Sequence, residues 1–140
     1  MIILDTNVVS ELMRPEPESA VLRWFDSASA ADVYVTAITM AEVLYGIELL
    51  ASGKRREALD ASAKRLFDVV FTDHVLGFDQ TAARAFSLIT SSRRRRGKPI
   101  SDFDAQIVSI AQVHGATLAT RNTADFEGCG VKIVNPWQAP

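Results

Sequence analysis

Five polar side chains, four of them acidic, lie close to the strands that we expect. Asp5, Glu42, Asn122 and Asp125 follow strands, and Asp104 opens a helix that leads into one. The carboxyl ends of parallel strands meet at one edge of a sheet, and open α/β sheets bind ligands in the crevice there. Carboxylates gathered in one crevice raise one another's pKa unless a cation is present. Since oxygen ligands suit hard cations, the pattern predicts a Mg²⁺ or Mn²⁺ site.

A divalent cation at such an edge can activate water and stabilise charge on a phosphate, which suits cleavage of a phosphodiester. Five basic residues within six positions lead directly into the segment that carries Asp104. They are Arg93, Arg94, Arg95, Arg96 and Lys98. This basic run could form a lip that binds phosphates. It could equally be a solvated face, because basic groups near a helix C-terminus complement the helix dipole.

Helix capping is the competing interpretation of each acid taken singly. Asp5 or Asn7 could cap the helix that begins near Val8. Thr39 and Glu42 have the spacing of a capping box, in which Glu42 would reach back to Thr39. Capping does not require the acids to share one edge of a sheet, however. Their common placement therefore favours a single site.

The elements that must position these side chains alternate between strands and helices. The alternation predicts an α/β protein, a three-layer α/β/α sandwich with a mostly parallel central sheet. We expect strands at 2–4, 33–38, 74–78, 117–120 and 131–135. We expect helices at 8–13, 19–27, 39–51 and 54–71. We also expect a long helix that Asp79 caps and that runs into the basic run, and a helix from its N-cap Ser101 to Gly115. In the last helix, Phe103 and Ile107 belong to the buried stripe, with Asp104 at its border.

Composition limits the protein's class. A chain of 140 residues, 48% hydrophobic, has enough apolar surface for a core without a structural metal. Cys129 is the only cysteine, so neither a disulfide framework nor a cysteine zinc site is available. No segment resembles a signal peptide or approaches the roughly 20 apolar residues of a membrane span. We therefore expect a soluble, cytoplasmic protein with no membrane partner.

Four motifs together resemble the PIN-domain ribonucleases, specifically the VapC toxins of bacterial toxin–antitoxin pairs and the related FitB-like proteins. They are Ile-Leu-Asp-Thr-Asn-Val-Val-Ser-Glu-Leu at 3–12, Ala-Ile-Thr-Met-Ala-Glu-Val-Leu-Tyr-Gly at 37–46, Ile-Ser-Asp-Phe-Asp-Ala-Gln-Ile at 100–107, and Ala-Thr-Arg-Asn-Thr-Ala-Asp-Phe at 119–126 through Asn-Pro-Trp at 135–137. The resemblance covers essentially the whole chain in the family's order. It implies a single PIN domain over residues 1–140.

By this resemblance, Asp5, Glu42 and Asp104 are the metal-binding and catalytic acids. The family's fourth acidic position falls at Asn122, which we count with the catalytic set. Its amide can accept a hydrogen bond or meet a metal but brings no negative charge, which weakens the case for a second tightly held metal. Four further residues are accessory candidates, namely Thr6, Asp102, Thr120 and Asp125. Asp125 could supply the missing charge or cap the turn before Phe126. The five residues of the basic run would bind RNA.

The resemblance further implies a Mg²⁺-dependent endoribonuclease, with Mn²⁺ as a substitute, that leaves a 5′ phosphate. It implies a homodimer whose two sites share a basic groove. It also implies a cognate antitoxin encoded by a neighbouring gene, with operator DNA contacted only through that antitoxin. Which RNA is cleaved depends on loop shape and groove contacts that no short motif encodes.

Two other functions compete with this interpretation. An aspartate-nucleophile phosphatase would also use Asp5, but such enzymes carry a second acid where this chain has Asn7. A degenerate PIN domain would bind RNA or a partner without cleaving. Asn122 favours that alternative, while the intact Asp5, Glu42 and Asp104 oppose it.

Overall fold

A parallel sheet forms the centre of the computed structural model, which describes residues 1–139. Its strand order is β3-β2-β1-β4-β5, and every neighbouring pair is parallel. The strands are β1 (Ile2–Leu4), β2 (Val33–Thr36), β3 (Val75–Leu76), β4 (Thr117–Ala119) and β5 (Lys132–Val134). The first strand of the chain is therefore the central one, and it ends directly before Asp5. The predicted α/β/α class with a parallel sheet is confirmed.

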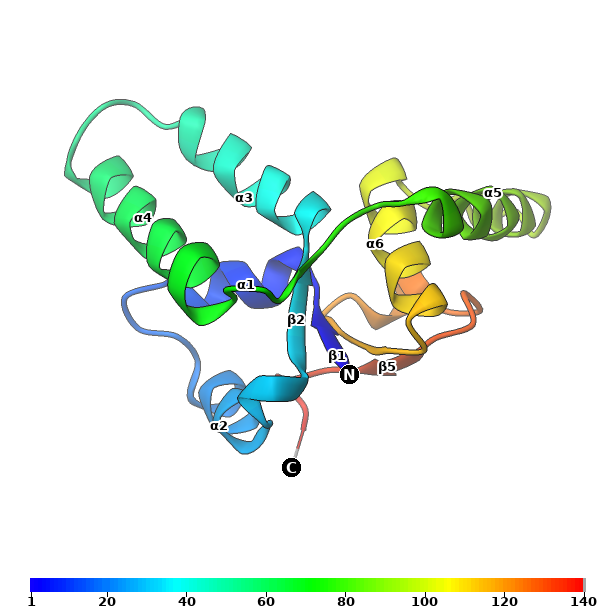
Figure 1. Ribbon diagram of the computed structural model, residues 1–140, viewed down its shortest axis with the longest axis horizontal. Coiled ribbons are helices and arrows are strands. Elements are labelled where there is room, and N and C mark those ends of the chain that lie inside the picture. The colour runs from blue at the N-terminus through cyan, green and yellow to red at the C-terminus, as the bar shows by residue number, and fades with distance from the viewer. Residues whose placement is uncertain (140) are drawn as a thin grey trace.

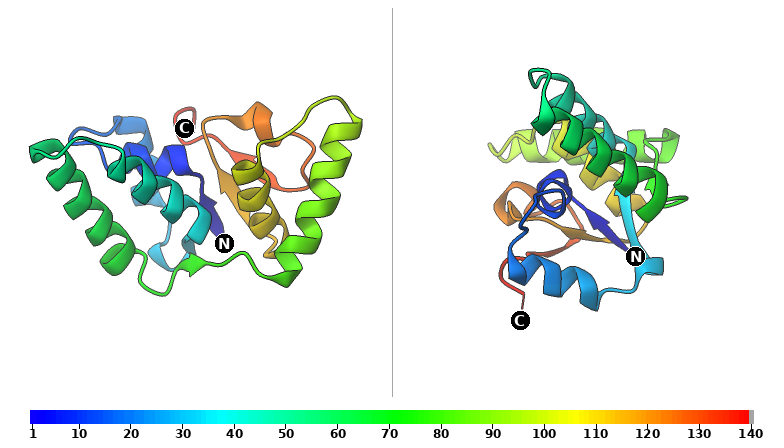
Figure 2. Two further views of the ribbon diagram at one scale, coloured as in Figure 1. Left: turned by 90° about the horizontal axis from the view of Figure 1, so that it is seen from above. Right: turned by 90° about the vertical axis from the view of Figure 1, so that its left-hand side faces the viewer.

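Helices cover both faces of the sheet (Figures 1 and 2). They are α1 (Thr6–Leu12), α2 (Ser19–Ser27), α3 (Ala37–Glu48), α4 (Lys54–Arg65), α5 (Gln80–Arg95) and α6 (Asp102–Val113). A π-helical turn at Leu66–Val70 extends α4. Helices α3 and α4 form the antiparallel pair at the upper left of Figure 1. Among residues 1–139, no helix combines the length and the apolar character needed to cross a membrane.

Alternating side chains of the strands feed two separate cores. Leu4 and Val35 pack with α1 to α4, whereas Ile3 and Leu118 pack with α5 and α6. The left view of Figure 2 shows these two groups of helices on opposite sides of the sheet. Because both faces of β1 are covered, its run of apolar residues is buried, as parallel strands require. The sheet is thus a rigid platform for whatever follows its strand ends.

The start of α3 differs from the prediction. The structure ends β2 at Thr36, and the Thr36 hydroxyl caps the helix by accepting from the Thr39 backbone N–H at 3.0 Å. Thr39 is therefore inside the helix, and Glu42 does not form the predicted capping box with it. The β-branched run at 33–38 suggested a longer strand, but its last two residues are helical. Glu42 is thereby left available to a more distant partner.

The first turn of α6 also differs in one respect. Ser101 caps the helix as predicted, accepting from the Asp104 backbone N–H at 3.3 Å. Phe103, expected in the buried stripe, is 51% exposed instead. It precedes the point at which α6 packs onto the sheet, whereas Ile107 one turn later is fully buried. Gly115 ends the helix with φ of 60°, a conformation that favours glycine.

Candidate active site

Asp5 is the most buried of the candidate acids, with only 4% of its surface exposed. Its Oδ2 accepts from the Thr120 hydroxyl at 2.7 Å and from Asn7 Nδ2 at 3.1 Å, and its Oδ1 accepts from the Thr6 backbone N–H at 2.8 Å. Burial raises the pKa of Asp5 from 3.8 to about 6, against the lowering effect of the hydrogen bonds from Thr120 and Thr6. The charges of Asp104 and Glu42 raise this pKa further. Asp5 does cap α1, but it also faces two other acids.

Glu42 is held in place by a hydroxyl from the neighbouring helix. The Thr6 Oγ1 donates to Glu42 Oε1 at 2.8 Å and lies 3.0 Å from the Thr39 hydroxyl. This contact joins the first turn of α1 to the first turns of α3. Burial raises the pKa of Glu42 and the charge of Asp104 raises it further, while the Thr6 hydrogen bond opposes the rise. Thr6, an accessory candidate, therefore contacts one of the candidate metal-binding acids directly.

Asp104 approaches from α6, and Asp125 approaches from the 3-10 turn at Thr123–Phe126. Burial raises the pKa of Asp104, and the charge of Asp125 adds to the rise. Both acids line one small cavity of about 200 Å³, together with Arg93 and Ser101. Charge effects on pKa therefore connect four acids at the carboxyl edge of the sheet, namely Asp5, Glu42, Asp104 and Asp125.

The remaining candidates lie around this edge in different ways. Thr120 is fully buried, and its hydroxyl contacts the Asp5 carboxylate directly. Asn122 is exposed, and its backbone N–H donates to Thr120 Oγ1 at 3.1 Å. Asp102 is exposed on the first turn of α6. Asn122, at the family's fourth acidic position, is therefore exposed to solvent next to the Thr120 that contacts Asp5.

Sequence reasoning missed the positioning role of Asn7, which it treated only as a possible cap. Asn7 Nδ2 donates to Asp5 Oδ2 at 3.1 Å and to Thr120 Oγ1 at 3.2 Å, and its Oδ1 accepts from the Arg121 backbone N–H at 3.2 Å. The amide thus joins the segment after β4 to the first turn of α1. The Asp-x-Asn spacing was the available signal, but the partner at Thr120 is 113 residues away.

The donor set has the chemistry that a hard divalent cation requires. Asp5, Glu42 and Asp104 offer oxygen atoms only, and within residues 1–139 none of them forms an ion pair. As the side chains lie, however, no three His, Cys, Asp or Glu residues in the described chain are close enough to hold a metal ion. Asp5 and Glu42 are turned toward Thr120 and Thr6. The residues therefore fit the ion by chemistry, although their side chains do not surround one position in this structure.

The basic run divides into two parts with different surroundings. Arg93 is only 5% exposed, and its guanidinium donates to backbone carbonyls rather than to solvent. Arg96 Nη2 donates to the Gly128 carbonyl at 3.2 Å, although the side chain remains exposed. Arg94, Arg95 and Lys98 are exposed. Helical spacing explains the division, because residues three apart share one face.

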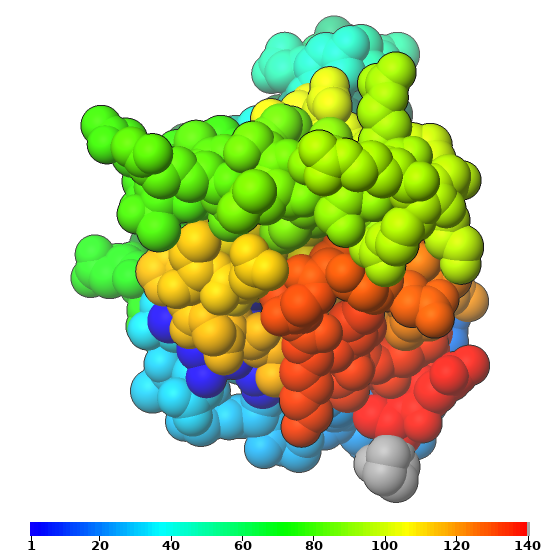
Figure 3. Space-filling model, turned by 90° about the vertical axis from the view of Figure 1, so that its right-hand side faces the viewer, coloured from blue at the N-terminus to red at the C-terminus, as the bar shows by residue number. Residues whose placement is uncertain are grey.

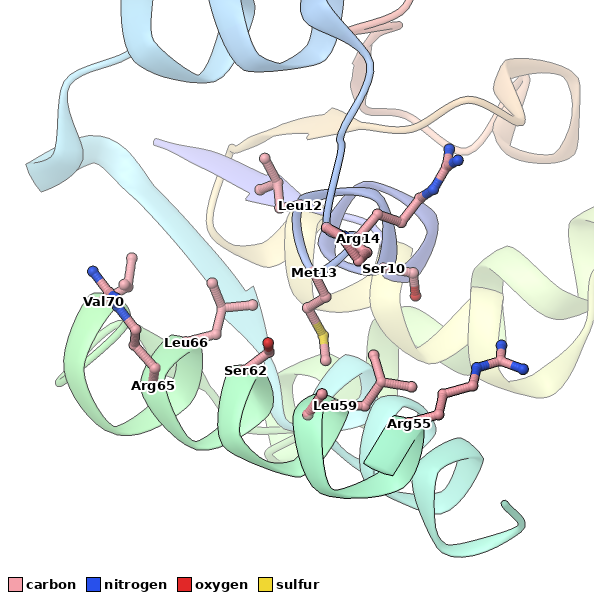
Figure 4. A pocket seen from close by; sticks show the side chains of 12 residues that line it. Ser10, Leu12, Met13, Arg14, Arg55, Leu59, Ser62, Arg65, Leu66 and Val70 are labelled. Atoms are coloured by element: carbon pink, nitrogen blue, oxygen red, sulfur yellow. The ribbon is translucent and has the colours of Figure 1, made fainter. Parts of the chain in front are cut away.

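An open groove of about 720 Å³ lies between the end of α1 and α4 (Figure 4). Its lining is mostly apolar, including Leu12, Met13, Leu59 and Leu66, and three arginines also line it, namely Arg14, Arg55 and Arg65. A second hollow of about 240 Å³ shares several of these residues and extends to Thr6 and Glu42. The groove therefore leads toward the candidate acids without containing them.

Comparison with known proteins identifies relatives along the whole chain. Residues 2–128 match the family described as PIN domain. Toxin FitB of Neisseria gonorrhoeae (strain ATCC 700825 / FA 1090) is 39% identical over 137 residues, which cover 98% of this chain and 99% of FitB. VapC ribonuclease Y4jK of Sinorhizobium fredii (strain NBRC 101917 / NGR234) is 38% identical over 138 residues, 99% of each chain.

The fold has a similarly close counterpart among solved structures. The structure of FitAB bound to an IR36 DNA fragment contains a chain with a TM-score of 0.92 and 38% sequence identity. The superposition covers 100% of this chain and 98% of that one. The likeness therefore extends over the sheet and both of its helical layers.

Proposed function

The chain belongs to the PIN-domain family and, within it, to the VapC/FitB group of toxins, and on this premise we propose that it is a Mg²⁺-dependent endoribonuclease. One observation carries the proposal most strongly. Asp5, buried at the end of the central strand, has its pKa raised to about 6 and is influenced by Glu42 and Asp104, and none of these three acids forms an ion pair within residues 1–139. Such a cluster is costly in a folded protein unless a cation stabilises it.

In the proposed reaction, Asp5, Glu42 and Asp104 hold the metal ion at the carboxyl edge of the sheet. When bound, Mg²⁺ would lower the pKa of a water molecule and neutralise charge on the phosphate. Hydrogen bonds of 2.7 to 3.1 Å keep two of these carboxylates in place. Thr120 and Asn7 hold Asp5, and Thr6 holds Glu42. Asn122 presents an amide oxygen at the rim, and the exposed Arg94, Arg95 and Lys98 attract the RNA backbone. The relative named a VapC ribonuclease supports RNA as the substrate class.

The direct test uses purified protein, a labelled RNA pool and Mg²⁺. We expect cleavage that stops when EDTA is added, returns with excess Mg²⁺ or with Mn²⁺, and is absent in Asp104→Asn. Asp26→Asn, which removes an exposed acid from α2, is the control for loss of a carboxylate. RNA binding without cleavage by the wild-type protein would favour the alternative of a degenerate, binding-only PIN domain.

We propose that a cognate antitoxin, encoded by a neighbouring gene, occupies the groove between α1 and α4. The groove is apolar, three arginines line it, and it continues into the hollow that reaches Glu42. An amphipathic segment with acidic flanks fits this lining, and its end would lie close enough to the acids to block metal and RNA. The relative solved as FitAB bound to a DNA fragment supports such a pair. We propose that operator DNA is contacted only through the antitoxin. We also propose that the toxin is a homodimer acting in the cytoplasm.

This partner is tested by reversing charge in the groove. Arg55→Glu combined with Arg65→Glu should reduce co-purification of the antitoxin and its inhibition of RNA cleavage. Arg84→Glu, an exposed position on α5, is the control for charge reversal outside the groove. Unchanged inhibition by the antitoxin in the double variant would place the antitoxin elsewhere.

A further inference from the structure

Arg93 is a buried cation whose charge is balanced in an unusual way. Arginine is rarely buried without a charged partner, because removing the charge from water is costly. In this chain the balance comes from backbone carbonyl groups. Arg93 Nε donates to the Lys98 carbonyl at 2.7 Å, and Nη1 donates to the carbonyls of Asp125 and Glu127 at 2.8 and 2.9 Å. Within residues 1–139 it belongs to neither of the two ion pairs.

These three carbonyls belong to two segments that carry candidate acids. Lys98 lies in the loop that leads to the Ser101 cap of α6, and hence to Asp104. Asp125 lies in the 3-10 turn after β4, 32 residues from Arg93 along the chain. One guanidinium therefore joins the two segments, and Figure 3 shows the end of α5 and its loop beside the segment near residues 125–130. Phe126, which is 1% exposed, anchors the same turn in the core below.

Arg93 also borders the cavity that Asp104 and Asp125 share, because its side chain lines that cavity with them. Arg96 holds the far end of the same loop through the Gly128 carbonyl. Gly128 has φ of 73°, and a Cβ there would lie 2.5 Å from Arg96 Nη1, so the loop follows the arginine closely. Arg93 and Arg96 thus hold the segment at 125–128 by hydrogen bonds to its backbone, whereas Arg94, Arg95 and Lys98 are exposed.

We propose that Arg93 is a positioning residue that fixes the Asp125 carboxylate beside Asp104, so that Asp125 supplies the negative charge that Asn122 does not. The inference rests on the proposed ribonuclease function, and it assigns to Arg93 a role other than RNA binding. A residue that contacts RNA changes KM and the salt dependence of binding. A residue that positions an acid changes kcat and the affinity for the metal ion.

The test compares Arg93→Lys, Asp125→Asn and the combined variant. Lysine keeps the charge but its single nitrogen cannot span the three carbonyls. We expect each single variant to lower kcat about tenfold and to weaken Mn²⁺ binding, measured by electron paramagnetic resonance, about tenfold. KM for RNA and the salt slope of RNA binding should stay unchanged. Because Arg93 acts through Asp125, the combined variant should be no worse than either single one. Arg84→Gln, elsewhere on α5, is the control.

Three results would overturn the inference. A raised KM with a smaller salt slope in Arg93→Lys would assign Arg93 to RNA binding. Multiplied losses in the combined variant would show that the two residues act separately. Wild-type kcat and Mn²⁺ affinity in Asp125→Asn would remove the role of Asp125, and this arm holds even if Arg93→Lys does not fold. If the wild-type protein binds Mn²⁺ but does not cleave RNA, the proposed function fails, and the Mn²⁺ affinities still decide the inference.

Discussion

The Thr120 hydroxyl donates a 2.7 Å hydrogen bond to Oδ2 of Asp5, joining the ends of the neighbouring strands β4 and β1. The two residues are 115 positions apart in the chain. The bond opposes the rise in the pKa of Asp5 that burial causes. It therefore keeps the carboxylate more readily ionised than its burial alone would allow.

Replacing Thr120 by Val should raise the pKa of Asp5 further, because the hydrogen bond that stabilises the ionised form is removed. The acidic limb of the pH–rate profile should move to higher pH. Activity on that limb should fall about tenfold if the pKa of Asp5 rises by one, with little change well above pH 7. Thr120→Ser retains the hydroxyl and should keep the wild-type profile. An acidic limb that stays in place in Thr120→Val would separate this bond from the ionisation of Asp5.

Asp5→Asn should stabilise the metal-free protein while abolishing cleavage. The pKa of Asp5 is about 6 in the folded protein against an ordinary value of 3.8, so between these values the folded state holds a proton that the unfolded chain has released. The unfolding free energy consequently falls as pH rises through this range and stays lower above it. Removing the charge should restore about 1–3 kcal/mol at neutral pH, since a pKa difference of one corresponds to about 1.4 kcal/mol and the missing hydrogen bonds offset part of the gain.

Urea unfolding in EDTA at neutral pH and near pH 4 measures this effect. The gain should be large at neutral pH and small near pH 4, where Asp5 is largely protonated in the folded state. Asp102→Asn controls for removing an exposed acid. Equal or lower stability of Asp5→Asn at neutral pH would mean that the buried carboxylate is not under electrostatic strain.

Asn122→Asp should strengthen metal binding, because it restores an acid at the rim of the cluster. An added charge near an exposed divalent ion contributes about 1 kcal/mol, which corresponds to about a fivefold lower Mg²⁺ concentration for half-maximal cleavage. Titration of Mg²⁺ against the initial rate measures this. Asn122→Ala, which removes the amide without adding charge, is the companion variant. A Mg²⁺ requirement that does not fall in Asn122→Asp would leave that position outside the metal's field.

Arg94→Ala combined with Arg95→Ala should weaken RNA binding and flatten its salt dependence, because fewer neutralised phosphates release fewer counterions. The slope of log affinity against log salt should change by roughly 0.7 for each phosphate of single-stranded RNA that an arginine no longer neutralises. Fluorescence anisotropy with labelled RNA in EDTA measures binding without cleavage. Binding that is unchanged across the salt titration would return these two side chains to a solvated face.

The sheet could be predicted because the pattern of apolar residues in each segment matches its burial in the fold. Buried parallel strands are continuous apolar runs, and helices carry one apolar stripe. Ile3 and Leu4 could be assigned to a buried strand since both faces of a central parallel strand are covered. The local caps at Asp79 and Ser101 were also predictable, as each contacts a backbone N–H three residues away. Thr39 was misassigned because the capping hydroxyl belongs to Thr36, a choice that depends on where β2 leaves the sheet.

The acids of the candidate site could be grouped from sequence because a parallel sheet brings its strand ends to one edge. What could not be predicted are the contacts between distant segments, such as Asn7 with Thr120. Arg93 shows the same limit. A run of arginines looks uniformly solvated in sequence, and only the packing of the loop at 125–128 turns one of them inward. Phe103 is the converse case, an apolar residue left exposed because its turn precedes the packed part of α6.

The proposed activity is metal-dependent cleavage of RNA at the site formed by Asp5, Glu42 and Asp104. The most direct measurement maps new 5′-phosphate RNA ends in cells that express this chain without its neighbouring gene, against cells that express Asp5→Asn at the same level. We expect ends concentrated at a few sites in the first cells and absent from the second, which would also identify the RNA. The same ends in both, or none in either with both proteins folded, would contradict it.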